Sequence, residues 1–417
     1  MSAPIGQSVL IYACAFAVAG ATPFLMLPIL TKHLSPEQFG EATAFLMLTA
    51  ILGNVAGLSA HGFVSVRFFK TAPAEFKGIV SSGLAAIGVS HLLAAVAVAA
   101  LYPLLRPTLG VPLPMAILAV GTALAVNLNL ISLAIFQSSS QPLLYLRARL
   151  VQGVFEFSLC LALVYLFQPD AGARAYSYAF AIAASATLGL FHCFKHGNVG
   201  TTIRRRHLRA LAAFGIPMLP HVVAGSAIVY LDRLVVSTVL GSESLGIYMV
   251  ATQIGMAMVA VIEPLNKGLA PWLFGQLAKN DAKVRRMIVT RTYLLYGALT
   301  LMGALVAGVS YLLFDKLISA RFGAARPLIP WVVSGFVLQG MYYSVVNYLF
   351  YAEQTGRLSV FSATTAVLGC AVSYALTSAF GLLGAAISFA LNNAVLFLLV
   401  WLAASRAVPM PWSLRWR

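Results

Sequence analysis

The segment LLGAAISFALNNAVLFLLVWLAA, residues 382–404, contains no acidic or basic side chain. A helix needs about 20 mostly apolar residues to cross the hydrocarbon core of a bilayer, and this segment is long enough. Similar runs recur along the whole chain, whereas a transmembrane barrel would show alternating segments of about 10 residues. The segment therefore predicts an all-α integral membrane protein.

The overall composition supports this fold class. Of the 417 residues, 60% are hydrophobic and 9% are charged, and mean hydropathy is +0.90. A soluble domain has about 25% charged residues, so this chain lacks the charge needed to cover a globule with a wetted surface. Apolar runs of the required length predict about twelve transmembrane helices. They cover residues 8–31, 41–66, 78–102, 113–138, 146–168, 174–195, 211–240, 244–274, 287–314, 327–351, 358–380 and 382–404.

The basic residues predict the orientation of these spans. If the N-terminus is cytoplasmic, 19 of the 27 Lys and Arg residues lie on the cytoplasmic side and 7 on the opposite side. Such an excess is what the positive-inside rule requires, so we expect both termini to be cytoplasmic. The net charge of +16 is spread in short clusters between apolar runs, which argues against a nucleic-acid partner. None of the four cysteines forms a CxxC pair, so no metal site is expected.

A short motif occurs in both halves of the chain. LSPEQFG at residues 34–40 follows the first apolar run, and LGSESLG at residues 240–246 follows the seventh. Repeats of six spans in parallel orientation are a transporter design. We therefore predict two six-helix lobes, residues 1–196 and 211–417, joined by a basic cytoplasmic linker at residues 197–210.

The linker contains Arg204, Arg205 and Arg206 in succession. Such a cluster is typical of the anchoring charges that fix membrane topology. A less favoured alternative is that this segment binds anionic lipid headgroups. The sequence leaves both interpretations open.

Several segments resemble one family of membrane proteins. They are LTKHLSPEQFG (residues 30–40), FGIP (214–217), DRLVVS (232–237), LGSESLGIY (240–248) and FGLLGAA (380–386). Together they resemble the bacterial polysaccharide flippases, which translocate O-antigen or exopolysaccharide units, of the MATE/MOP exporter superfamily. Chain length, span number and short loops are similar as well.

The resemblance implies that the two six-helix lobes surround a central cavity. It also implies a membrane transporter, not an enzyme, in the bacterial inner membrane. The transporter would move a polyprenyl-pyrophosphate-linked oligosaccharide from the cytoplasmic to the periplasmic leaflet by alternating access, for surface polysaccharide biosynthesis. Membrane lipids and other polysaccharide-assembly membrane proteins are the expected partners. No cofactor is implied, and the sequence does not decide whether a proton or a sodium gradient drives transport.

Charged residues inside spans are the candidates for substrate contact, because each costs roughly 2.5–3.5 kcal/mol to insert and by default faces a cavity or a partner. Glu263 and Lys267 are four residues apart on one helix face. We predict that Lys267 meets substrate phosphate and is held by Glu263, unless the two only neutralise one another. The repeat places His61 at the position equivalent to Lys267, and Arg67 lies two turns beyond His61. These three residues would form a cationic lining.

Three further charges lie within spans. Asp232 and Arg233 are adjacent, so they point in different directions on a helix and do not simply pair with each other. They would act as an outer gate between the lobes or make a structural contact within one lobe. Glu156 is the lone acid of its span, and is a candidate for ion coupling or a hydrogen-bonded structural acid.

Two alternative functions remain at this point. A drug exporter of the same superfamily would have an acidic cavity, whereas this chain has only 11 acidic residues. A polysaccharide polymerase or ligase would need a substantial catalytic loop, and the loop at residues 315–326 is short.

Overall fold

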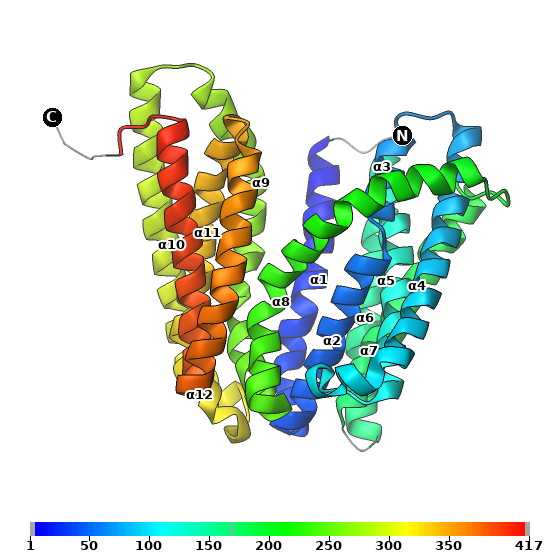
Figure 1. Cartoon of the computed structure of the whole chain (residues 1–417), viewed down its shortest axis with the longest axis horizontal. Helices are drawn as coiled ribbons and strands as arrows, with labels where there is room; N and C mark the ends of the chain where they lie inside the picture. Colours follow the sequence, from blue (N-terminus) through cyan, green and yellow to red (C-terminus); the bar gives the residue numbers. More distant parts are fainter. Residues whose placement is uncertain (1–4, 168–169, 413–417) are drawn as a thin grey trace. The chain divides into compact units, whose positions relative to one another are not determined.

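The computed structural model describes residues 5–167 and 170–412, which are almost entirely helical and contain no strand (Figure 1). Within these residues nine helices are long and apolar enough to cross a membrane. The elements are α1 (Ile5–His33), α2 (Pro36–Ala56), α3 (Ala60–Phe68), α4 (Pro73–Leu109), α5 (Leu113–Ser138), α6 (Pro142–Leu166), α7 (Ala171–Lys195), α8 (Arg205–Gly255), α9 (Ala257–Leu277), α10 (Ala282–Leu317), the 3-10 helix η1 (Ala320–Leu328), α11 (Ile329–Tyr351) and α12 (Thr355–Ala407). The predicted all-α membrane fold is confirmed.

The predicted spans map onto these helices, with two kinds of departure. The span predicted as one helix at residues 41–66 is two helices, α2 and α3, separated by a break. Conversely, α12 runs through two predicted spans, and α8 runs through one and into the next. The span predicted at residues 244–274 is divided between α8 and α9. A reversal of direction inside such a long element needs a residue that leaves helical geometry.

Glycine supplies both reversals. Gly241 in α8 has φ 84° and ψ 179°, and Gly381 in α12 has φ 61° and ψ −139°. Positive φ with extended ψ is a region that only glycine enters readily, because it has no Cβ. Each glycine therefore ends one span and starts the next without a loop.

The turn between α1 and α2 uses side-chain capping instead. Ser35 is the N-cap of α2: the Gln38 backbone N–H donates to Ser35 Oγ at 3.2 Å, and the Ser35 N–H donates to Gln38 Oε1 at 2.9 Å. This capping box satisfies two orphan backbone donors. Ser35 and Gly241 occupy equivalent positions in the predicted repeat, so the two halves turn at the same point by different chemistry.

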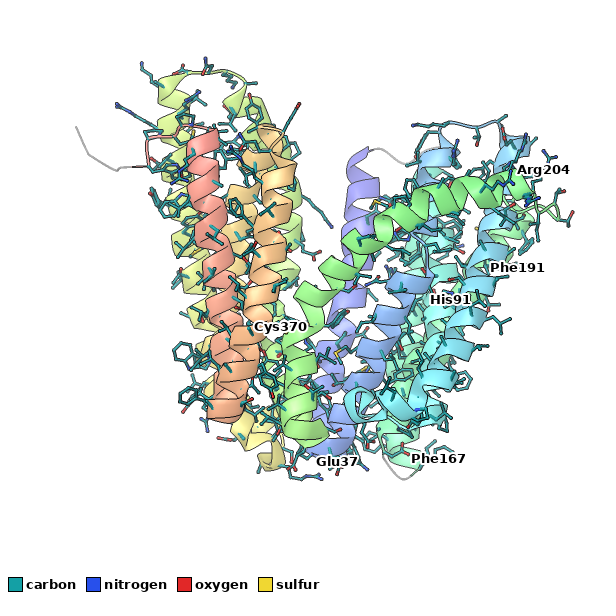
Figure 2. All side chains as sticks on the ribbon, in the orientation of Figure 1. Glu37, His91, Phe167, Phe191, Arg204 and Cys370 are labelled. Carbon is teal, nitrogen blue, oxygen red and sulfur yellow. The ribbon has the colours of Figure 1, made fainter. Side chains whose placement is uncertain are left out.

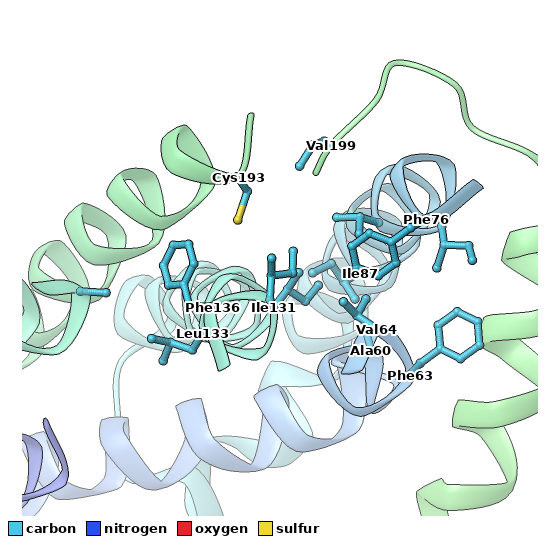
Figure 3. Close-up of a cluster of buried hydrophobic side chains, with 14 of the residues drawn as sticks. Ala60, Phe63, Val64, Phe76, Ile87, Ile131, Leu133, Phe136, Cys193 and Val199 are labelled. Carbon is cyan, nitrogen blue, oxygen red and sulfur yellow. The ribbon is translucent and has the colours of Figure 1, made fainter. Parts of the chain in front are cut away.

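The chain forms two compact units, Met1–Tyr230 (unit 1) and Leu231–Arg417 (unit 2). In unit 1 the core lies among α3, α4, α5 and the end of α7 (Figure 3). Phe63, Ile87 and Ile131 are each at most 3% exposed there. In a bilayer the alternative environment of these side chains is lipid, so they stabilise the unit by close van der Waals packing between helices.

Unit 2 has a separate core between α9, α11 and the second part of α12. Tyr348, Leu349 and Val400 are almost fully buried in it. The segment that follows α12 returns to the start of α10: Arg285 Nη1 donates to the Pro409 carbonyl at 2.8 Å, and Tyr293 Oη donates to the Trp412 carbonyl at 2.8 Å. The end of the described chain is therefore fixed to unit 2.

The predicted linker at residues 197–210 packs onto unit 1. Val199 and Leu211 are buried in the core of that unit. The boundary between the compact units lies at Tyr230, inside α8, because the first part of α8 stays with α2 and α3. The Asn54 amide donates to Ser226 Oγ at 2.9 Å, for example. The lobe limits read from the repeat remain a prediction about sequence symmetry.

Substituting Gly241 tests the glycine turn. We expect Gly241→Ala to destabilise the protein by about 1–3 kcal/mol, because alanine must adopt a backbone conformation reserved for glycine. The measurement is thermal unfolding of the purified protein in detergent. Gly297→Ala is the control, since Gly297 lies within helix α10 with open space around it. Equal melting temperatures for the two variants would contradict this account of the turn.

Candidate functional site

The break between α2 and α3 positions the first two candidate residues. Leu58 and Ser59 both have φ 50°, which ends α2 and restarts the helix at Ala60. Asn127 on α5 fills the gap: its amide donates to the Gly53 carbonyl at 3.0 Å and to the Ala123 carbonyl at 3.1 Å. The Gly53 carbonyl also accepts from the Gly57 N–H at 2.9 Å, so it has a backbone donor and a side-chain donor where α2 ends.

His61 and Arg67 both lie on the short helix α3. His61 is in its first turn and is exposed. Arg67 is in the last turn, half-buried, with its guanidinium carbon 5.2 Å from the centre of the Phe63 ring. A cation at a helix C-terminus and over an aromatic face is doubly favoured. The two residues therefore lie on one nine-residue helix of unit 1.

Glu263 and Lys267 form the predicted pair on α9 in unit 2. Their charged atoms are 4.0 Å apart, and their side chains are 51% and 66% exposed. An exposed pair at this distance is worth about 0–1 kcal/mol, so rearranging it costs little. Neither the Glu263 carboxylate nor the Lys267 ammonium is buried by the protein.

The other side of α9 is packed against α11. The Asn347 amide donates to Asn266 Oδ1 at 2.8 Å and to the Tyr343 carbonyl at 2.9 Å. The cavity beside Asn266 and Tyr343 has a volume of about 10 Å³, which holds about one water molecule. This contact fixes the rotation of α9, and Lys267 is exposed on the face that α11 does not cover.

Asp232 has its partner within unit 2. After the reversal at Gly241, Tyr248 comes back alongside, and its hydroxyl donates to Asp232 Oδ2 at 2.7 Å. Asp232, Arg233 and Tyr248 are all buried. The observed contact of Asp232 is a structural one within its unit, which is one of the two interpretations considered above, and the gate stays a prediction.

Glu156 is also paired. Its Oε1 accepts a hydrogen bond of 2.5 Å from Arg174 Nη1 on α7, and the two residues are 5% and 7% exposed. The Arg174 guanidinium carbon lies 5.8 Å from the centre of the Tyr178 ring. Removing one partner of a buried ion pair typically costs 3–5 kcal/mol, because the other charge is left without compensation. A structural role is thus evident, and ion coupling remains a prediction.

The sequence did not indicate these partners. Arg174 counts as an outer-loop charge by position, yet the structure buries it in the first turn of α7. Asp170, which caps that helix by accepting from the Ala173 N–H at 3.1 Å, is the signal that α7 starts early enough to include Arg174. Tyr248 and Asn127 carry no such signal, because only the folded chain shows what their polar atoms contact.

These pairings determine which charged groups within the spans could contact a substrate. The buried intramembrane acids Glu156 and Asp232 already accept hydrogen bonds from Arg174 and Tyr248. Among the intramembrane candidates, His61, Lys267 and the Glu263 carboxylate beside Lys267 are exposed. The exposed intramembrane positions are thus better suited to a phosphate than to a cationic molecule.

Comparison with known proteins identifies relatives that match most of the chain. A family model described as "Polysaccharide biosynthesis protein" matches residues 5–277. A Haemophilus influenzae protein described as an uncharacterized membrane protein is 24% identical over 359 residues, which is 84% of this chain and 85% of that protein.

Solved structures share the fold. The lipid II flippase MurJ in an inward closed conformation matches with a TM-score of 0.75 at 13% identity, covering 95% of this chain and 87% of MurJ. An inward-facing multidrug resistance MATE family transporter of the MOP superfamily matches with a TM-score of 0.66 at 14% identity, covering 95% and 94%. At such identities the likeness is one of fold.

Neutralising Glu156 tests its structural role. We expect Glu156→Gln to destabilise the protein by about 3–5 kcal/mol in detergent, because the Arg174 guanidinium would stay buried without a counter-charge. The double variant Glu156→Gln/Arg174→Gln should lose less than the sum of the two single variants. Glu243→Gln, at an exposed carboxylate, is the control.

The opposite result would identify Glu156 as an ion-coupling residue. That result is a Glu156→Gln protein as stable as the wild type whose transport no longer responds when the proton gradient is collapsed. Thermal unfolding and transport are therefore measured on the same preparation.

Proposed function

This chain belongs to the polysaccharide biosynthesis protein family, and on that premise we propose that it flips a polyprenyl-pyrophosphate-linked oligosaccharide across the bacterial inner membrane. It is a multi-pass membrane transporter of the MOP superfamily. Transport runs from the cytoplasmic to the periplasmic leaflet by alternating access, with both termini cytoplasmic. The product serves the assembly of a surface polysaccharide such as O-antigen or exopolysaccharide.

One observation carries the choice of an anionic substrate: the Lys267 side chain is 66% exposed on α9. The charged part of the substrate is its pyrophosphate, which cannot cross hydrocarbon without compensating charge. A lysine ammonium is a compact, flexible point charge suited to that group. His61 and Arg67 add two further groups of the same sign when His61 is protonated.

Drug export, the alternative function, finds less support. A cationic drug requires exposed carboxylates, and the buried acids Glu156 and Asp232 are engaged by other side chains. Glu263 is exposed, yet it has Lys267 beside it. The charges that remain exposed on these spans therefore favour an anion.

Replacing Lys267 tests this proposal. We expect Lys267→Ala to abolish restoration of surface polysaccharide in a flippase-deficient strain, with unchanged protein in the membrane, because the pyrophosphate loses its counter-charge. Lys267→Arg keeps the charge and should retain part of the activity. Lys316→Ala, at an exposed lysine near the end of α10, is the matched control.

Two results would count against the proposal. The first is full activity of Lys267→Ala, which removes this residue from the substrate path. The second is failure of the wild-type chain to complement the strain while it exports a cationic dye from the same cells, which favours the drug exporter.

A further inference from the structure

Exposed basic side chains gather at one end of unit 1, where the connection between α7 and α8 crosses the start of α4. We call this group the basic patch. Its members are Lys70, Lys77, Lys195, Arg204, Arg205 and Arg209. Figure 2 labels Arg204 toward this end of unit 1, with Glu37 and Phe167 at the opposite end.

The patch is held in place by hydrogen bonds between the connection and α4. Ser81 Oγ donates to the Gly200 carbonyl at 2.6 Å and accepts from the Gly200 N–H at 2.9 Å. Ser82 Oγ accepts from the Arg204 N–H at 3.1 Å. The Lys77 ammonium lies beside Gly197. These contacts bring the basic residues of α4 and of the connection together on one fixed surface.

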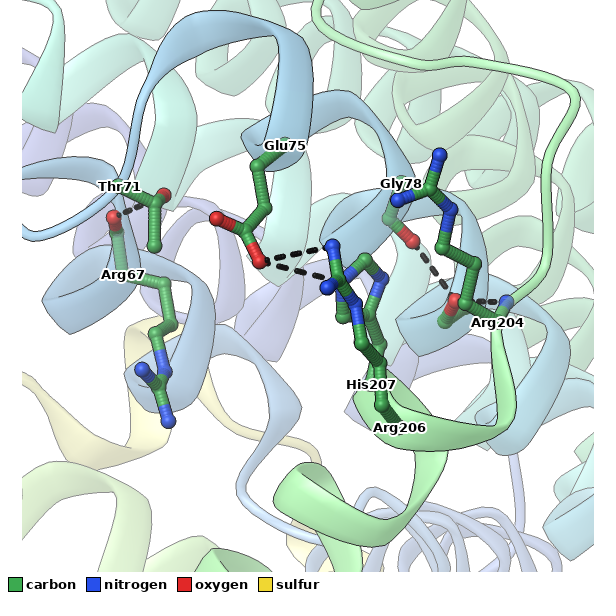
Figure 4. Close-up of polar contacts among 8 residues, drawn as sticks. Arg67, Thr71, Glu75, Gly78, Arg204, Arg206 and His207 are labelled. Carbon is green, nitrogen blue, oxygen red and sulfur yellow. Dashed lines mark hydrogen bonds and ion pairs between the residues drawn. The ribbon is translucent and has the colours of Figure 1, made fainter.

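The acid nearest to the patch is already engaged. Glu75 accepts from Arg206 at 3.1 Å and lies 3.6 Å from His207 Nε2, while Arg206 Nε donates to the same His207 nitrogen at 3.2 Å (Figure 4). The sequence has no other Asp or Glu at residues 42–155 and none at residues 171–231. Arg206 and Glu75 therefore fix the start of α8, and the positive charge of the patch is not cancelled.

Apolar side chains are interleaved with the cations. Phe69 is 74% exposed beside Lys70, Phe194 is 56% exposed beside Lys195, and Ile203 is 56% exposed beside Arg204. Exposed rings and aliphatic groups next to the cations would make no contact with a small soluble anion. They match a membrane surface, because phosphates and acyl chains lie next to each other there.

We propose that the basic patch binds the phosphate headgroups of anionic phospholipids in the leaflet that meets this end of unit 1. Arg204, Arg205 and Arg209 supply guanidinium forks that fit phosphate oxygens in pairs. Phe69, Phe194 and Ile203 contact the adjoining acyl region. The lipid thereby becomes a ligand of the segment that precedes α8, and this inference does not depend on which substrate is flipped.

The test uses the purified full chain in detergent, titrated with phosphatidylglycerol or with phosphatidylcholine of the same acyl chains, and read by native mass spectrometry. We expect phosphatidylglycerol to bind the wild type more tightly than phosphatidylcholine. The triple variant Arg204→Ala/Arg205→Ala/Arg209→Ala should lose about 100-fold in phosphatidylglycerol affinity, from the usual contribution of each basic residue near an anionic lipid surface.

The control variant, Lys32→Ala/Lys316→Ala/Arg321→Ala, removes the same formal charge from exposed positions in segments outside the patch. It should bind phosphatidylglycerol like the wild type. Thermal unfolding without added lipid should be the same for the wild type and both variants, because the substituted side chains are exposed and outside the cores. Equal binding by the wild type and the patch variant, or an equal loss in the control, would overturn the proposal.

Inorganic phosphate separates a lipid site from a site for free anions. At a concentration equal to that of the lipid it should leave phosphatidylglycerol bound, because it lacks acyl chains to contact the apolar side chains. Displacement of the lipid by inorganic phosphate under these conditions would show a site for soluble anions and would likewise overturn the inference.

Discussion

Every backbone N–H and carbonyl inside a bilayer needs a partner from the protein, since hydrocarbon supplies none. This constraint determines where the helices of this chain are allowed to end. Ser35 and Gln38 cap the start of α2, and the Asn127 amide occupies the break between α2 and α3. At Gly241 and Gly381 the chain reverses without a loop. Each end or break of a helix therefore depends on particular residues, as a packed core position does.

The buried acids within the spans likewise have partners inside the protein. Glu156 is neutralised by Arg174, and Asp232 accepts from Tyr248, so both acids are satisfied inside their own units. Lys267 differs, because its side chain is 66% exposed on α9, 4.0 Å from the Glu263 carboxylate. A charge that is inserted at a cost and left exposed is the natural place to look for function.

Much of the fold could be predicted from the sequence, because span length is set by bilayer thickness and apolar runs report it directly. The position of the turn at Ser35 and at Gly241 also followed, from the repeated LSPEQFG and LGSESLG segments. The break at Leu58 and Ser59 did not, since hydropathy continues through it and the contact of Asn127 with the end of α2 is seen only in the folded chain. The candidate site residues could be chosen from the sequence, because a charge within a span is visible there. Their roles could not, because the partners Arg174 and Tyr248 depend on how the helices are rotated against each other.

The pairing of Glu156 with Arg174 has a consequence for how the chain enters the membrane. Helix α6 leaves the ribosome before α7, and at that moment its carboxylate has no counter-charge, at a penalty of roughly 2.5–3.5 kcal/mol on insertion scales. Arg174 arrives in the first turn of the following helix. Released together into lipid, the two helices carry one neutral pair instead of two opposed charges. We therefore expect α6 and α7 to enter the membrane as a pair, with α6 held at the translocon until α7 has been made.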